Sequence, residues 1–468
     1  MRKLRLLAAA TCSAVALLTG AAAQAETLTD ALISAYRNSN LLDQNRALLR
    51  ATDEDVAVAV SALRPVVQFV AQSTYNFQRL HGPVASLDLS VGERGNTESL
   101  SSSVGITASM TLFDFGRNRL AVEAAKENVL ATREALINVE QNVLLDAVDA
   151  YVQVRLAQSI VDLRRSNLSL IEQELQAAQD RFDVGEVTRT DVAQAQAALA
   201  ASRSNLTSAE GDLTVAREAY KAAIGHYPSD LKALPSAPRT ADSLDAARQV
   251  ALRGHPSVRQ AQRQVAAADL NVARAKAAMR PTLSGDASVG LDESGQETAS
   301  VGLSLRQTLY SGGQLSALYR QSLANRDAQK ANLLQTGVLI GQNVGIAWST
   351  VQVASAAIAA GTEEVRAART AFEGVREEAT LGARTTLDVL NAEQDLLDAQ
   401  ADRLTAEAQR YVGIYQVLSS MGLLTVEHLN LGIPTYDPAA YYNAVKNAPA
   451  TSSQGRRLDR VLQSIGRD

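Results

Sequence analysis

Two short stretches contain the residues of this chain whose types and spacing point to a defined role. They are RFDVGEVTRTDV, residues 181–192, and TLGARTTLDV, residues 380–389. In each, a glycine is followed six residues later by an Asp-Val pair, so that Gly185 precedes Asp191 and Gly382 precedes Asp388. Glycine adopts the left-handed conformation that ends a helix, and Thr or Asp side chains accept the unpaired N–H groups of the following helix. Each stretch is therefore predicted to be the tight connection of two antiparallel helices.

Residue types that commonly perform catalysis or bind metals show no comparable pattern. The four histidines are scattered and match no metal-ligand spacing such as H-E-x-x-H. They are His81, His226, His255 and His428. The sequence has no P-loop, no Rossmann glycine pattern and no G-x-S-x-G motif. Carboxylates are plentiful, but they lie on solvated faces of predicted helices. We therefore expect no catalytic residue, no cofactor and no metal site, and we regard an enzyme as a poor alternative.

The first 25 residues are predicted to be a secretory signal peptide. Positive residues near the N-terminus precede a short apolar run, and Ala23-Gln24-Ala25 is a typical cleavage site. The only cysteine, Cys12, would leave with this peptide, which excludes disulfides from the mature protein. Removal of Arg2, Lys3 and Arg5 would change the formal net charge from -5 to about -8, which argues against nucleic acid as a partner. No later stretch approaches an uninterrupted apolar run of about 18 residues, so no transmembrane helix is expected.

The mature chain contains an internal repeat. Residues 28–65 align without gaps on residues 244–281, and residues 112–225 align on residues 309–422. The predicted organisation is a signal peptide (1–25), a first repeat (26–225), a linker (226–242), a second repeat (243–431) and a polar, partly mobile C-terminal tail (432–468). All length change between the repeats falls between the two aligned blocks, as is typical of surface segments.

Each of these variable segments, about residues 66–113 and 282–310, is predicted to be a pair of β-strands. Apolar and polar residues alternate along four strands of about ten residues, which is the length that a tilted strand needs to cross a membrane. Phe113, Phe115 and Tyr310 lie where strands give way to helices and are candidates for an interfacial aromatic girdle. The alternative is two soluble hairpins packed on a core.

Long helices argue against that alternative. Residues 117 to about 182 and 314 to about 381 contain no proline, and each stretch would form a helix about 100 Å long. Return helices are expected over residues 190–224 and 387–421, with the apolar spacing of coiled-coil packing. Four membrane strands in one chain would leave open edges that lipid does not tolerate. The smallest closed barrels have about eight strands. Three chains would supply about twelve strands, which is enough to close a barrel without open edges.

With these features in place, the sequence resembles the TolC family of outer-membrane efflux and secretion ducts over about residues 27–431. The resemblance rests on the signal peptide, the repeat, the strand pairs and above all the GARTTLDVLNAEQ stretch that begins at Gly382. It implies an α+β membrane protein with two internal structural repeats. Three protomers, each with four strands, would form a 12-stranded outer-membrane β-barrel continuous with a long periplasmic α-helical barrel. Its partners would be a periplasmic adaptor and an inner-membrane ABC or proton-driven transporter.

The resemblance also implies a gate at the periplasmic end, held shut by hydrogen bonds and ion pairs between helix pairs. By motif position, Thr190 and Asp191 lie on the first hairpin, and Arg384 on the second is their expected partner. Asp388 matches the family's constriction carboxylate, which would form a ring of three that favours cations.

Two positions depart from the family pattern. Ala379 stands at the position of a gating tyrosine, and Asn391 stands at the position of a second constriction Asp. The closed state is therefore expected to be held less firmly. Alternatively, Asp191 and Asp388 serve only as helix caps. Arg384 fits that alternative less well, because a cation at a helix N-terminus is mildly unfavourable.

The expected function is the exit duct of a tripartite export system in the outer membrane of a Gram-negative bacterium, spanning into the periplasm. Type I protein secretion is favoured by the RTTLDVLNA stretch and by the tail with Tyr436, Asp437 and Pro438. Multidrug or small-molecule efflux is the alternative. An exported structural coiled-coil protein explains the helices but not the four symmetric strands.

Overall fold

The computed structural model describes residues 25–79, 96–447 and 460. The expected signal peptide up to residue 24, with Cys12, lies outside the described residues, as do His81 and most of the end of the tail. Backbone contacts divide the chain into two compact units, and each unit draws on both sequence repeats. The first unit comprises residues 1–45, 136–258 and 337–436, and the second comprises residues 46–135, 259–336 and 437–468.

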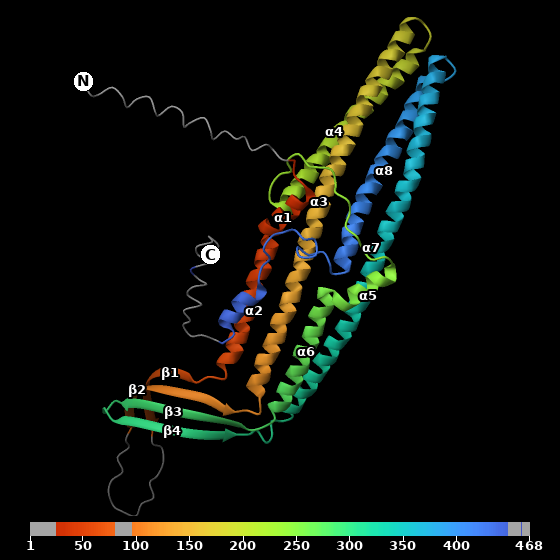
Figure 1. The fold of residues 1–468 in the computed structure, drawn as a ribbon. Coiled ribbons are helices and arrows are strands. Elements are labelled where there is room, and N and C mark those ends of the chain that lie inside the picture. The colour runs from red at the N-terminus through yellow and green to blue at the C-terminus, as the bar shows by residue number, and fades with distance from the viewer. Residues whose placement is uncertain (1–24, 80–95, 448–459, 461–468) are drawn as a thin grey trace, which may run out of the picture. The chain divides into compact units, whose positions relative to one another are not determined.

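Within the described residues, long helices and one sheet account for most of the chain (Figure 1). The helices are α1 (Leu28–Asn38), α2 (Asn40–Ser61), α3 (Arg117–Asp183), α4 (Arg189–Ile224), α5 (Leu244–Gly254), α6 (Pro256–Ala277), α7 (Gln314–Thr380), α8 (Thr386–Ser420) and α9 (Pro438–Val445). The strands are β1 (Val66–Arg79), β2 (Asn96–Phe113), β3 (Thr282–Asp292) and β4 (Glu297–Arg306).

The helices α3 and α7 each contain 67 residues, a length of about 100 Å at 1.5 Å per residue. Helix α7 also has the length and composition of a helix that could cross a membrane. The expectation that the chain has no transmembrane helix stays a prediction, because this match rests on length and composition only. The sequence analysis required an uninterrupted apolar run for a transmembrane helix. In α7, isolated polar residues interrupt the small apolar ones. Helices in the core of an assembly share this composition.

The four strands form one antiparallel sheet in the order β1-β2-β3-β4. Strand β2 contains 18 residues and is longer than the ten or so expected. Its first half is rich in serine, so the alternation of apolar side chains that marks the other strands is absent there. Strand β4 ends at Arg306, before the expected limit near residue 310.

The two faces of this sheet differ sharply in polarity. On one face, Leu283 pairs with Leu305 and Ala287 pairs with Val301 across β3 and β4. Val301 is 89% exposed in the single chain, so this apolar face is uncovered. On the other face, serine hydroxyls pair across the same strands: Ser284 Oγ lies 3.0 Å from Ser304 Oγ, and Ser288 Oγ lies 2.8 Å from Ser300 Oγ. A sheet with one apolar and one hydroxyl-lined face suits lipid on one side and water on the other.

The expected girdle aromatics lie at the strand ends. Phe113 and Phe115 meet edge to face with ring centroids 4.7 Å apart, and Phe115 has a positive φ of 54°. Tyr310 is 87% exposed.

The core of the first unit forms around Tyr151 of α3, which is fully buried. Its hydroxyl donates to the carbonyl oxygens of Glu26 at 3.0 Å and Lys232 at 2.8 Å. Glu26 and Leu231 form a parallel bridge, with Glu26 N donating to Asp230 O at 2.7 Å and Lys232 N donating to Glu26 O at 2.9 Å. The linker is therefore held against Glu26 by backbone bonds and one buried phenol.

The polar tail contains helix α9, which the sequence analysis did not predict. Asp437 accepts a hydrogen bond from Ala439 N at 2.8 Å, and Pro438 occupies the first helical position, as is typical of a helix start. In the second unit, the hydroxyl of Tyr441 donates to Glu54 of α2 at 2.7 Å, and the Arg133 guanidinium lies 5.2 Å from the centroid of the Tyr442 ring. These contacts from distant parts of the chain fix a helix that is too short to stand alone.

Replacing Tyr151 by Phe is expected to destabilise the first unit by about 1–3 kcal/mol, because the buried carbonyl of Glu26 and the part-buried carbonyl of Lys232 would lose the hydroxyl donor. Thermal unfolding followed by circular dichroism measures the loss. Tyr227→Phe is the matched control, since the exposed Tyr227 hydroxyl donates to Glu218 at 2.8 Å. Equal unfolding temperatures for Tyr151→Phe and wild type would contradict this account of the linker.

Candidate functional site: the hairpin ends

The connection between α3 and α4 is closed by backbone geometry and a capping box. Gly185 has a φ of 83°, and Glu186 N donates to Arg181 O at 2.9 Å, which ends α3. Thr188 caps α4: Asp191 N donates to the Thr188 hydroxyl at 3.4 Å, and Thr188 N donates to the Asp191 carboxylate at 2.9 Å. Hydrogen bonds from the Thr188 side chain and backbone lower the pKa of Asp191.

The connection between α7 and α8 repeats this arrangement. Gly382 has a φ of 74°, and Ala383 N donates to Glu378 O at 2.9 Å. Asp388 N donates to the Thr385 hydroxyl at 3.2 Å, and Thr385 N donates to the Asp388 carboxylate at 2.9 Å. Backbone and side-chain hydrogen bonds from Thr385 lower the pKa of Asp388. Both aspartates therefore perform a capping role and are held in their charged form near neutral pH.

Arg384 contacts its own hairpin in the single chain. Its Nε lies 2.8 Å from the Glu378 carboxylate, and both side chains are about half exposed. Asp191, the expected partner, is instead engaged by Thr188. Thr190 and Asn391 are exposed. An exposed ion pair contributes little to the stability of a folded chain, so the Arg384–Glu378 pair is available for exchange with other carboxylates.

A contact that the sequence analysis missed joins the two hairpins. Arg181, in the last turn of α3, donates from Nη1 to the carbonyl oxygen of Ala379 at 3.2 Å. The Ala379 side chain is buried against Phe372 and Val389. At this position the chain uses its backbone carbonyl to receive a cation from the neighbouring hairpin.

A buried polar cluster lies behind the second hairpin. Glu393 of α8 is only 3% exposed. Its Oε1 accepts a hydrogen bond of 2.6 Å from the Asn167 amide of α3, whose own oxygen accepts from the Ser202 hydroxyl of α4 at 3.0 Å. Its Oε2 is buried and has no hydrogen-bond partner among the described residues. Burial raises the pKa of Glu393 to about 7.

A second carboxylate completes this cluster. Glu174 of α3 is 6% exposed and pairs with Arg376 of α7 at 3.1 Å. The charge of Glu174 adds to the raised pKa of Glu393, whereas Arg376 acts in the opposite direction. Two buried carboxylates and their polar partners thus join α3, α4, α7 and α8. The sequence does contain a pattern that could have identified Glu393. It lies midway between Val389 and Leu397 at four-residue spacing, which places its carboxylate on the buried stripe of α8.

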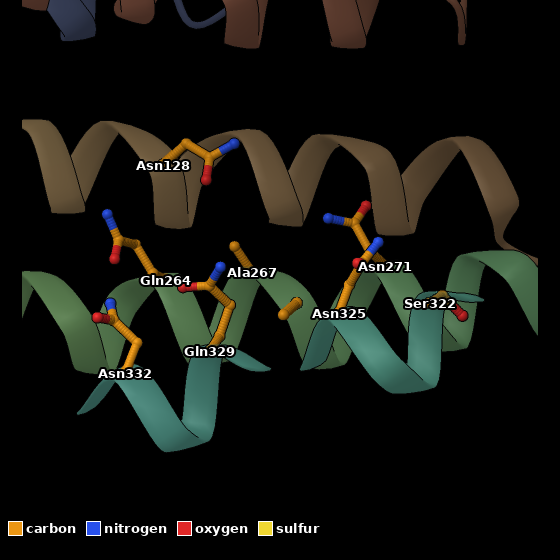
Figure 2. Close-up of a pocket in the computed structure, with 9 residues that line it drawn as sticks. Asn128, Gln264, Ala267, Asn271, Ser322, Asn325, Gln329 and Asn332 are labelled. Carbon is orange, nitrogen blue, oxygen red and sulfur yellow. The ribbon is translucent and has the colours of Figure 1, made fainter. Parts of the chain in front are cut away.

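The second unit contains a cavity of about 660 Å³ between α3, α6 and α7. It is lined mainly by carboxamides, which Figure 2 shows on all three helices. Its amide-bearing residues are Asn128, Gln264, Asn271, Asn325, Gln329 and Asn332. Because amides do not titrate near neutral pH, this cavity offers hydrogen bonds and no acid–base chemistry.

Replacing Glu393 by Gln is expected to remove a pH-dependent loss of stability. The pKa of this carboxyl is about 7 in the folded chain and 4.5 in its ordinary state, so the folded state binds the proton more tightly. The free energy of unfolding of the wild type should fall by about 3 kcal/mol as the pH rises from about 4.5 to about 7. Above this range it should stay at the lower value. Glu393→Gln keeps a neutral side chain at every pH and should be the more stable protein at pH 8.

Thermal unfolding at pH 5 and pH 8 provides the measurement, with the exposed Glu186→Gln as the matched control. If the stability of Glu393→Gln depended on pH in the same way as that of the wild type, the raised pKa assigned to Glu393 would be contradicted.

Comparison with known proteins agrees with these features. Residues 8–226 and 247–422 match the family described as outer membrane efflux protein. The chain is 36% identical to the outer membrane efflux protein BepC of Brucella suis biovar 1 (strain 1330), over 94% of this chain and 95% of BepC. It is 29% identical to the alkaline protease secretion protein AprF of Pseudomonas aeruginosa, over 60% of this chain and 62% of AprF. The solved structure of the outer-membrane channel OprN is similar with a TM-score of 0.74 and 24% identity, over 84% of this chain and 89% of OprN.

The solved relatives are TolC-like trimeric channels. They confirm the expected fold class: an α+β membrane protein with internal repeats, of the kind in which protomers share an outer-membrane β-barrel and a periplasmic α-helical barrel. The outer-membrane location and the absence of an enzymatic role follow from the same matches. The chain belongs to the outer membrane efflux protein family of TolC-like channels.

Proposed function

We propose that this chain, as a homotrimer, forms the exit duct of a tripartite export system that passes cargo from an inner-membrane transporter and a periplasmic adaptor across the outer membrane. The observation that carries this proposal is the four-stranded sheet. Its outer strands, β1 and β4, have no further strand beside them among the described residues, and its two faces differ in polarity.

Closure of this sheet requires other copies of the chain. In hydrocarbon an unpaired backbone group costs several kcal/mol, so a spanning sheet must have no edges. With four strands per protomer, three protomers supply twelve strands, which is above the minimum of about eight for a closed membrane barrel. The apolar face with Val301 then meets lipid, and the serine face lines a water-filled pore.

Small-molecule efflux is the cargo class that the similarity to BepC supports. BepC is named an outer membrane efflux protein, and the similarity covers nearly the whole of both chains. Energy would come from the transporter, since a duct of this family performs no chemistry itself.

Type I protein secretion is the second candidate, and the hairpin sequence favours it. The RTTLDVLNA stretch that begins at Arg384 resembles ducts that serve protein export. AprF, named an alkaline protease secretion protein, is similar over more than half of its length. The two candidates share the duct and differ in transporter and cargo.

The hairpin ends are proposed to form the gate of this duct. Thr190, Asp191 and Asn391 lie at the ends of the helix pairs, and Asp388 would form a ring of three carboxylates around the threefold axis. Arg384 would hold neighbouring helix pairs together by exchanging Glu378 for a carboxylate of the adjacent hairpin. The exposed Arg384–Glu378 pair supports this role because separating it costs little burial.

A deletion strain distinguishes the two cargo classes. If the duct serves efflux, the strain should become sensitive to toxic small compounds, and the cloned wild-type chain should restore resistance. If it serves secretion, proteins should disappear from the culture supernatant with no change in sensitivity. A strain with neither change would contradict the exit-duct proposal for both cargo classes.

Replacing Arg384 by Ala is expected to raise the conductance of the purified channel in a planar bilayer several-fold, because the link between hairpins would be lost. Glu378→Ala should have a smaller effect, since Glu378 contacts Arg384 only within one hairpin. Arg366→Ala is the matched control, because it removes an exposed pair with Glu363 on the side of α7. Unchanged conductance in Arg384→Ala would eliminate Arg384 as a gate residue.

A further inference from the structure

A cavity of about 450 Å³ at the helix-proximal end of the sheet brings together three arginines from different elements. Arg117 is the first residue of α3, Arg280 lies between α6 and β3, and Arg306 is the last residue of β4. Asp286 of β3 is the only carboxylate that lines it. All of these residues belong to the second unit.

The strand register places this cavity on the hydroxyl-lined face of the sheet. Thr282 pairs with Arg306, and Ser284 pairs with Ser304, whose hydroxyl oxygens lie 3.0 Å apart. The intervening pair, Leu283 with Leu305, points to the opposite face. Arg306 therefore shares a face with the serines and lies away from the surface that suits lipid.

No ion pair among the described residues compensates the charges of these arginines. Arg117, Arg280 and Arg306 form no ion pair with any residue among 25–79 and 96–447. The Arg280 guanidinium lies 5.1 Å from the centroid of the Phe115 ring, and this contact leaves its edge N–H groups free to donate. With one carboxylate against three guanidinium groups, the cavity has an excess of two positive charges.

We propose that this cavity is an oxyanion-binding site for phosphoryl groups of solutes in the pore. Guanidinium groups present several N–H donors in a planar fork that matches the oxygens of phosphate, and the hydroxyls of Ser284 and Ser304 add further donors at the cavity wall. The location in the pore rests on the proposed function, whereas the binding chemistry rests on the cavity alone. In a trimer the site would be repeated three times.

Inorganic pyrophosphate tests the site by isothermal titration calorimetry on the full-length protein in detergent at low salt. Wild type should bind it, and binding should weaken with added salt. Arg306→Gln should weaken binding about tenfold, because one charge-assisted contact is lost. Arg306→Lys keeps the positive charge but loses the planar set of N–H donors. Its affinity for pyrophosphate should therefore lie between those of the wild type and Arg306→Gln. Arg253→Gln, which removes an exposed arginine of α5 outside the cavity, is the matched control.

The outcomes separate the site from the duct. Pyrophosphate binding that Arg306→Gln and Arg117→Gln leave unchanged would overturn the proposal, even if the protein conducts. Binding that depends on both arginines would support the site, even if no conductance is found and the duct proposal fails. Competition by phosphatidylglycerol in mixed micelles would assign the site to lipid headgroups and overturn the assignment to solutes, whereas binding indifferent to this lipid would support it.

Discussion

The constraint on which the rest of the structure depends is that a sheet in lipid tolerates no open edge. Strands β1 and β4 end a four-stranded sheet whose apolar face is uncovered, and neither edge finds a partner among the described residues. One chain cannot satisfy its own backbone groups in hydrocarbon. Assembly with further copies is therefore a condition for a stable protein in the outer membrane, and the internal repeat supplies two strand pairs per protomer towards closure.

In the proposed gate, one set of hairpin residues would satisfy local and functional requirements together. Asp191 and Asp388 complete capping boxes, so their carboxylates are fixed in position and remain charged. A carboxylate fixed in this way can still present charge to a pore, because capping uses only part of its accepting capacity. Behind the turns, the buried carboxylates Glu393 and Glu174 join helices through polar contacts with Asn167 and Arg376.

Several elements of the fold could be predicted from sequence for clear physical reasons. The long helices followed from the absence of proline, and the turns followed from Gly185 and Gly382 with their capping threonines. Strand β2 was predicted too short, since its serine-rich half has no apolar alternation. Helix α9 was missed because tertiary contacts from Tyr441 and Tyr442 stabilise it, and such contacts are invisible to local patterns.

The candidate site was predictable to a lesser extent. Turn chemistry is local, so the capping pairs could be identified. The Arg181 bond to the Ala379 carbonyl joins residues 198 positions apart and leaves no sequence pattern. The partner of Arg384 was expected on the other hairpin, whereas within one chain the nearby Glu378 is within reach. Glu393 was overlooked although its position on an apolar stripe was visible.

The most direct test of the central claim is single-channel recording of the purified wild-type protein in a planar lipid bilayer. A trimeric duct predicts discrete conductance steps of uniform size from folded protein. Folded protein that associates with the bilayer and produces no steps would contradict the claim that this chain forms an outer-membrane channel.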